Sequence, residues 1–261
     1  YSALRNVLVN AKRYTNWVIK NRVFVNPAAG FLEITETELE PPTKATSQYF
    51  KDEEDLLAAL HAARDFHEGY PEIPYLLLSW LGIDKRDIVA MKDNQVNLGS
   101  RTIKDASGNV IISGFSDAIK NALEAYVACD GAYRDHGSSP AWVTKDKSTD
   151  TFIKKLLTKN SDYFGKLNTT NQLDSNVNEA GKVYKKNGGK KKLTQGNVLR
   201  SGQFFRLAEL EKTQGIDVTA PKNRDIFRSI VNNVKDVSDL VKTYRGYRQV
   251  LHPELENKSN P

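Results

Sequence analysis

Apolar residues along most of this chain recur every three or four positions, which is the spacing of an amphipathic α-helix. The first such stretch runs from Ser2 to Phe24 and stops at Asn26-Pro27, a pair that breaks helices. Asp52 and Ser116 precede later stretches and are placed to cap their first turns. The remaining pattern predicts helices at residues 53–66, 75–81, 84–91, 117–129, 151–159, 193–210, 225–234 and 237–251.

One region changes to a pattern typical of β-strands. Residues 97–103 and 109–113 flank Asp105-Ala-Ser-Gly108, a typical turn sequence, and this arrangement predicts a small β-hairpin. Residues 131–140 are rich in turn formers, and residues 161–192 are polar with little apolar period. We expect loops there, with at most one short helix. The predicted fold class is α+β, mainly α with a small β-hairpin or sheet.

A change in composition divides the chain. Residues 31–48 hold an acidic run followed by two prolines and show neither period clearly, so we interpret them as a linker. They separate a helical segment at residues 1–30 from a larger domain at residues 49–252, and residues 253–261 are expected to be a flexible tail. The sequence begins without a methionine and already in helical pattern, and we therefore expect it to be part of a longer protein.

Composition favours a globular protein with a polyanionic partner, since 39% of the 261 residues are hydrophobic and the formal net charge is +6. The single cysteine, Cys129, excludes an internal disulfide framework and a cysteine-based zinc site, as expected in the cytoplasm. The longest apolar run, residues 75–83, is about half of the roughly 20 residues that a membrane-spanning helix needs, so no membrane contact is expected. The histidines are scattered without metal-ligand spacing, and neither a metal nor a cofactor is predicted.

Short segments of the sequence, taken in order, resemble motifs of the tyrosine recombinase or phage integrase family. They are the box I-like Trp80-Leu-Gly-Ile83 with Asp87-Ile-Val-Ala-Met91, the predicted hairpin, the box II-like helix with Leu199-Arg200, and the late Tyr244-Arg245-Gly246-Tyr247. The resemblance covers nearly the whole chain. It implies that residues 49–252 fold like a recombinase catalytic domain. It also implies that residues 1–30 hold the last helix of a truncated, DNA-clamping core-binding domain.

The family's reaction needs a tyrosine that attacks a DNA phosphate, two arginines that hold the phosphate oxygens, and lysine and histidine groups that move protons. In this chain the box I arginine falls on Asp84, and the box II histidine falls on Asn197. Arg86 lies two places beyond the box I position, so on a helix it would point elsewhere. Box III should lie in residues 232–239, which contain neither histidine nor tryptophan. Because several cooperating groups are missing, the resemblance implies an inactive homologue with no catalytic residues.

The chain nevertheless keeps residues that, according to the resemblance, would hold a phosphate. Arg200 matches the box II arginine, and Lys104 matches the hairpin lysine. A lysine-rich run just before box II would add salt-sensitive contacts with the DNA backbone. The candidate DNA-binding residues are Arg200, Lys104, Arg86, Lys190, Lys191, Lys192, Arg245, Arg248, Tyr247 and Arg13. The structural alternatives are an ion pair of Arg200 with Glu209, a solvated lysine loop, and late tyrosines that pack inward or form hydrogen bonds.

Two functions of different classes follow. The first is a sequence-specific regulator that binds double-stranded operator DNA, similar to the recombinase-like repressors that maintain lysogeny in SP-beta-type Bacillus phages. It would be a monomer or weak dimer, released by a phage-encoded antirepressor or a peptide-linked regulator. The second is an active integrase that uses Arg86, Lys104 and either Tyr244 or Tyr247. A module that binds only proteins is a third alternative, and it would lack DNA affinity at any salt concentration.

Overall fold

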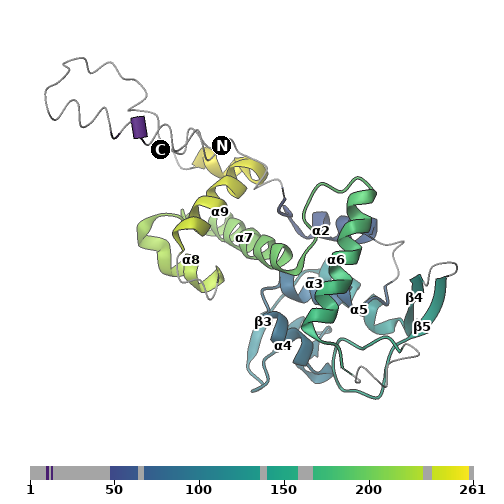
Figure 1. The fold of residues 1–261 in the computed structure, drawn as a ribbon. Coiled ribbons are helices and arrows are strands. Elements are labelled where there is room, and N and C mark those ends of the chain that lie inside the picture. The colour runs from purple at the N-terminus through teal and green to yellow at the C-terminus, as the bar shows by residue number, and fades with distance from the viewer. Residues whose placement is uncertain are drawn as a thin grey trace, which may run out of the picture. The chain divides into compact units, whose positions relative to one another are not determined.

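The computed structural model describes residues 10–11, 13, 48–63, 68–135, 140–157, 167–231 and 237–258 (Figure 1). The chain divides into two compact units, Tyr1–Thr43 and Lys44–Pro261. In the first unit, residues 10, 11 and 13 are described, and they are helical. The rest of the predicted first helix, and the predicted linker up to residue 47, lie outside the described residues.

The second unit is mainly helical, as the apolar period predicts. Its α-helices are α2 (Glu53–Ala63), α3 (Glu72–Trp80), α4 (Lys85–Ala90), α5 (Asp117–Ala128), α6 (Thr170–Lys186), α7 (Gln195–Gln214), α8 (Arg224–Val231) and α9 (Ser238–Leu251). Short 3-10 helices lie at η2 (Asp93–Gln95), η3 (Pro221–Asn223) and η4 (Pro253–Lys258). The last of these falls in the segment expected to be a flexible tail, and its Leu255 is buried in the core.

Short polar side chains start several of these helices. The Asp52 carboxylate accepts a hydrogen bond at 2.9 Å from an amide in the first turn of α2, and the Ser116 hydroxyl does the same at 3.2 Å for α5. Both caps are as the sequence predicts. Thr169 and Thr194 cap α6 and α7 in the same way. Each cap satisfies an amide that the first turn leaves without a helical partner, so these residues determine where the helices begin.

The predicted hairpin is present, but its predicted first strand, residues 97–103, is interrupted by a turn at residues 98–101 and contributes to two strands of a three-stranded antiparallel sheet. The strand order is β1 (Val96–Asn97), β2 (Thr102–Lys104) and β3 (Val110–Ser113). In the turn between β2 and β3, the Asp105 amide donates to the Asn109 carbonyl at 2.8 Å. The Asp105 carboxylate accepts from the amides of Ser107 and Asn109, both at 2.9 Å. The turn therefore forms where the sequence predicts it.

A second hairpin was not predicted, because residues 131–140 were interpreted as turns. Instead β4 (Gly131–Asp135) pairs antiparallel with β5 (Pro140–Thr144). Ala132 and Val143 are buried opposite each other, while the neighbouring pair Tyr133 and Trp142 is exposed with ring centroids 5.1 Å apart. This alternation of inward and outward pairs was the missed strand signal, because the turn formers around it obscured the period of two.

The expectation of loops across residues 161–192 was wrong for α6, a helix of 17 residues. Its buried side chains Leu173, Val177, Ala180 and Tyr184 recur at spacings of three or four, which is the helical period. The stripe is narrow, since the rest of the helix is polar and carries asparagine, lysine and glycine. Packing of α6 against α2 and α3 supplies the stability that the intrinsic helix propensity of these residues does not.

The predicted helix at residues 151–159 is also wrong for its described part. Residues 151–157 run as irregular chain that is held by isolated bridges from Thr151 to Lys92 and from Leu156 to Lys145. Phe152, Ile153 and Leu156 are all buried. Their apolar spacing therefore reflects burial in the core rather than a helical face.

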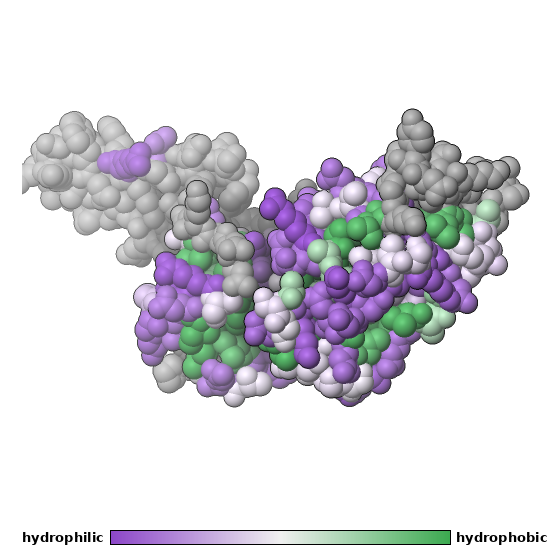
Figure 2. All heavy atoms as spheres, turned by 90° about the horizontal axis from the view of Figure 1, so that it is seen from below, coloured by the Kyte–Doolittle hydropathy of each residue, from purple (hydrophilic) through white to green (hydrophobic). Residues whose placement is uncertain are grey.

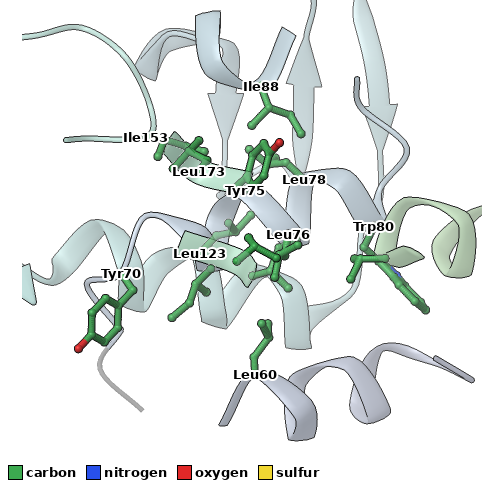
Figure 3. Close-up of a cluster of buried hydrophobic side chains, with 14 of the residues drawn as sticks. Leu60, Tyr70, Tyr75, Leu76, Leu78, Trp80, Ile88, Leu123, Ile153 and Leu173 are labelled. Carbon is green, nitrogen blue, oxygen red and sulfur yellow. The ribbon is translucent and has the colours of Figure 1, made fainter. Parts of the chain in front are cut away.

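Two clusters of buried apolar side chains form the core, and α7 belongs to both. The larger cluster surrounds α3, all nine residues of which are buried. In Figure 3, Tyr75, Leu76, Leu78 and Trp80 of α3 lie among Leu60, Ile88, Leu123, Ile153 and Leu173 from neighbouring segments. Val198 at the start of α7 joins this cluster, whereas Phe204 and Leu207 join the cluster with α8 and α9. Figure 1 shows α7 running between these two groups of helices.

A glycine lets α7 approach the end of α3 closely. A Cβ atom at Gly202 would lie 2.0 Å from the Trp80 carbonyl oxygen, which is backbone and has little room to move. We expect Gly202→Ala to lower the free energy of unfolding in urea by about 1–3 kcal/mol, since overpacking forces the helices apart. Gly196→Ala is the matched control, because a Cβ at Gly196 in the first turn of α7 meets nothing. Equal stability of Gly202→Ala and wild type would contradict this packing.

Candidate nucleic-acid interface

The start of α7 holds Asn197, the residue that the sequence resemblance aligns with the box II histidine. Asn197 is buried, and its side-chain amide donates to the Gln48 carbonyl at 2.8 Å and to the Lys192 carbonyl at 2.9 Å. It therefore ties the chain before α2 and the lysine-rich loop to the first turn of α7. A neutral amide suits this role because both of its donated bonds end on carbonyl oxygens.

Arg200 lies one turn further along α7 and is half-buried. Its Nη1 atom is buried and has no hydrogen-bond partner among the described residues. The guanidinium carbon lies 6.0 Å from the centre of the Phe204 ring, and burial lowers the pKa of Arg200 from its ordinary value. Arg200 forms no ion pair with Glu209, whose carboxylate oxygen Oε1 lies 3.5 Å from the Lys212 amine. This cation is partly removed from water and lacks an anionic partner in the described part of the chain.

Asp84, in the box I-like segment, has a structural role. Asp84 caps α4 by accepting a hydrogen bond from the Arg86 amide at 2.9 Å. The neighbouring Lys85 pairs with Asp174 of α6 at 2.9 Å. Arg86 itself is exposed on α4. Asp84, on which the sequence resemblance places the box I arginine, thus serves as a helix cap.

Arg206 is a half-buried arginine of α7 that the sequence analysis did not single out. Its Nη1 donates to the Trp80 carbonyl at 2.6 Å, and burial lowers its pKa to about 10. Gly82, with φ of 96°, leaves space for the Arg206 guanidinium, since a Cβ atom at Gly82 would lie 2.6 Å from Arg206 Nη2. Arg206 therefore fixes α7 to the end of α3. The glycine in Trp80-Leu-Gly82 was the only sequence signal of this contact. It could not identify Arg206 as the partner, because Arg206 is distant in the sequence.

The lysine-rich loop between α6 and α7 presents two of its three candidates to solvent. Lys190 and Lys192 are exposed. Lys191 is partly buried, forms an ion pair with Asp55 of α2, and has its Nζ 5.6 Å from the centre of the Phe50 ring. Lys191 and Asn197 therefore hold the loop against α2 and α7, while Lys190 and Lys192 remain exposed to solvent. Lys104, at the end of β2, is exposed as well.

The candidates on α9 divide into exposed and buried residues. Tyr247 and Arg248 were expected at the DNA surface, but both are buried. The Tyr247 hydroxyl donates to the Lys51 carbonyl at 2.8 Å, and Arg248 Nη1 lies 3.0 Å from a Glu211 oxygen. Arg245 is exposed, and its Nε donates to the Thr219 hydroxyl at 3.2 Å. Tyr247 and Arg248 pack in the interior because the helical period turns them towards α7.

Arg13 is exposed and belongs to the first unit, so its position relative to α7 is not described.

Figure 2 shows one face of the molecule, on which hydrophilic side chains dominate the described surface and hydrophobic ones form separate patches. No group of three or more histidine, cysteine, aspartate or glutamate side chains able to hold a metal ion was found among the described residues. Of the helices in the described ranges, none is long and apolar enough to cross a membrane.

This mainly helical unit with small antiparallel sheets has the fold of a tyrosine recombinase catalytic domain. The crystal structure of XerA recombinase is similar to it with a TM-score of 0.51 and 15% sequence identity, over 97% of this chain and 83% of that chain. The sequence matches no protein-family model. It also matches no curated protein. The structural similarity therefore establishes the fold, which the sequence motifs predicted.

Proposed function

We propose that this chain is a sequence-specific, double-stranded DNA-binding regulator of transcription, a phage or prophage repressor that maintains lysogeny without recombinase activity. The observation that carries the proposal is that Arg200, which is only half-buried, has no anionic partner among the described residues. It lies on α7, the helix that resembles box II, and an arginine fork pairs well with two phosphate oxygens. The recombinase-like fold supports DNA as the source of that phosphate.

The residues that replace the family's catalytic groups support binding without cleavage. Asp84 caps a helix, and by the sequence resemblance it stands at the position of a phosphate-binding arginine, where a carboxylate would repel the phosphate. Asn197 is held by two carbonyl oxygens and has no proton to exchange near neutral pH. Lys190, Lys192 and Lys104 are exposed and would add backbone contacts that position the protein without reading sequence. A phage-encoded antirepressor or a peptide-linked regulator is the partner that this proposal expects to release the DNA.

Crosslinking and sequencing of bound DNA in the host, followed by affinity measurements on the recovered sites, tests the proposal. We expect Arg200→Gln to weaken binding by about tenfold or more, the loss of one charge-assisted hydrogen bond. Arg228→Gln is the matched control, because Arg228 on α8 is exposed and pairs with Asp225 at 3.2 Å. It removes the same charge and should change affinity by less than about threefold. Equal losses in both variants would contradict a specific role for Arg200.

The distribution of sites separates the two function classes. Several related sites upstream of genes, lost with Arg200→Gln, would support the regulator. A single site at an integration junction would favour the active integrase. Failure to recover any DNA, with no affinity even at low salt, would favour the protein-binding module.

A further inference from the structure

A cavity of about 440 Å³ lies at the side of the three-stranded sheet, between β1, the end of α5 and the chain that follows β5. Its walls include the apolar side chains of Val96, Leu98, Val127, Tyr126 and Phe152. The Tyr126 and Phe152 rings are tilted against each other with centroids 6.3 Å apart, and both are buried. The volume and the apolar lining are in the range of small-molecule sites.

Lysines 145, 147 and 154 also line this cavity. Two of them are neutralised within the protein, because the Lys154 amine lies 2.6 Å from an Asp93 oxygen and the Lys147 amine lies 2.6 Å from an Asp130 oxygen. Lys145 is different. Its side chain is buried, its amine donates to the Tyr126 carbonyl, and the amine lies 3.5 Å from the centre of the Tyr126 ring.

The positive charge of the Lys145 ammonium is therefore only partly balanced by its partners within the protein. The ammonium carries three protons, and among the described residues one carbonyl oxygen and one ring face receive them. Burial lowers its pKa to about 8, and the nearby Cys129 and Asp130 act against this shift, although Asp130 is ion-paired with Lys147. A buried charge without a full set of partners is costly, and an anion placed beside it would recover part of that cost.

We propose that this cavity binds a small aromatic carboxylate, with the carboxylate against Lys145 and the ring system against Tyr126 and Phe152. The charge of Lys145 selects the acid group. The aromatic and aliphatic walls favour a flat apolar body, and the cavity volume accommodates two fused rings. A DNA phosphate does not fit this description, since it would leave the aromatic and aliphatic walls of the cavity without a partner. The proposal is thus independent of the DNA-binding function.

Calorimetric titration of the full chain with 2-naphthoate tests the site. We expect saturable binding of one equivalent, and Lys145→Met to weaken it by about tenfold or more, because methionine keeps the length of the side chain and removes the charge. Lys182→Met is the matched control, since the Lys182 side chain on α6 is 72% exposed, is already paired with Glu179, and does not line the cavity. It should change affinity by less than about threefold. The neutral analogue 2-naphthamide should bind about tenfold or more weakly than the acid.

A second measurement on wild-type protein keeps the test independent of variant folding. Reductive methylation read by peptide mass spectrometry should show Lys145 protected by 2-naphthoate and Lys182, which lies outside the cavity, unprotected. Absence of 2-naphthoate binding, equal affinity for the amide, or unchanged labelling of Lys145 would each overturn the proposal. Saturable binding with Lys145 protected would support it.

Discussion

Replacing Arg248 with methionine is expected to lower the free energy of unfolding by about 3–5 kcal/mol, because it leaves a buried carboxylate without its cation. Arg248 Nη1 lies 3.0 Å from a Glu211 oxygen and 3.2 Å from an Asp217 oxygen. The Glu211 side chain is 4% exposed, and burial raises its pKa even with Arg248 present. Its other oxygen accepts from the Tyr244 hydroxyl at 2.8 Å. Loss of the cation would therefore weaken a network that joins α7 to α9.

Urea unfolding of matched variants measures this effect. Arg245→Met is the control, because Arg245 lies three residues earlier on α9, is exposed, and should change the free energy of unfolding by less than about 1 kcal/mol. Adding Glu211→Gln to Arg248→Met should recover part of the loss, since it removes the unpaired charge. An Arg248→Met protein that unfolds at the wild-type urea concentration would show that the network contributes no stability.

No covalent DNA–phosphotyrosine adduct is expected when the protein is incubated with a nicked suicide substrate that carries its bound sequence. Tyr244 and Tyr247 are the late tyrosines, and both side chains are fully buried. Their hydroxyls donate to a Glu211 oxygen and to the Lys51 carbonyl. Burial raises the pKa of each well above the ordinary value, which disfavours the phenolate that would attack a phosphate.

Denaturing gel electrophoresis of the labelled substrate detects such an adduct, with an active tyrosine recombinase on its own site as the positive control. Tyr244→Phe and Tyr247→Phe should give the same blank lane as the wild type. An adduct in the wild type that disappears in one of these variants would overturn the inactive assignment and identify the nucleophile. It would also require α9 to leave its packed position, because the hydroxyl must reach the DNA.

Local signals in the sequence were sufficient for much of the helical frame. Asp52 and Ser116 cap helices as predicted, because a cap depends on a few neighbouring residues. The Asp105 turn is likewise local. Leu199-Arg200 on an amphipathic helix and the order of the other motifs were enough to predict the recombinase-like fold, which the similarity to XerA recombinase supports.

The same reasoning failed where tertiary contacts outweigh local preference. The helix α6 has a polar composition and is stabilised by a narrow apolar stripe against its neighbours, so its sequence looks like a loop. The strands β4 and β5 pair across turn-forming residues that conceal their period. Residues 151–157 are apolar because they are buried, and their spacing mimics a helix without forming one.

By itself, the sequence determined which residue types stand at the motif-like positions, Asp84 and Asn197 among them. Only the tertiary structure decided what each charged or polar side chain meets. Arg200 and Arg248 are both arginines on helices, yet one has a buried Nη1 without a described partner and the other ends on two carboxylates. Lys145 acquires its cavity from segments that are distant in the chain. The reason is physical, since partners and burial arise from contacts between distant segments, and local periodicity does not encode them.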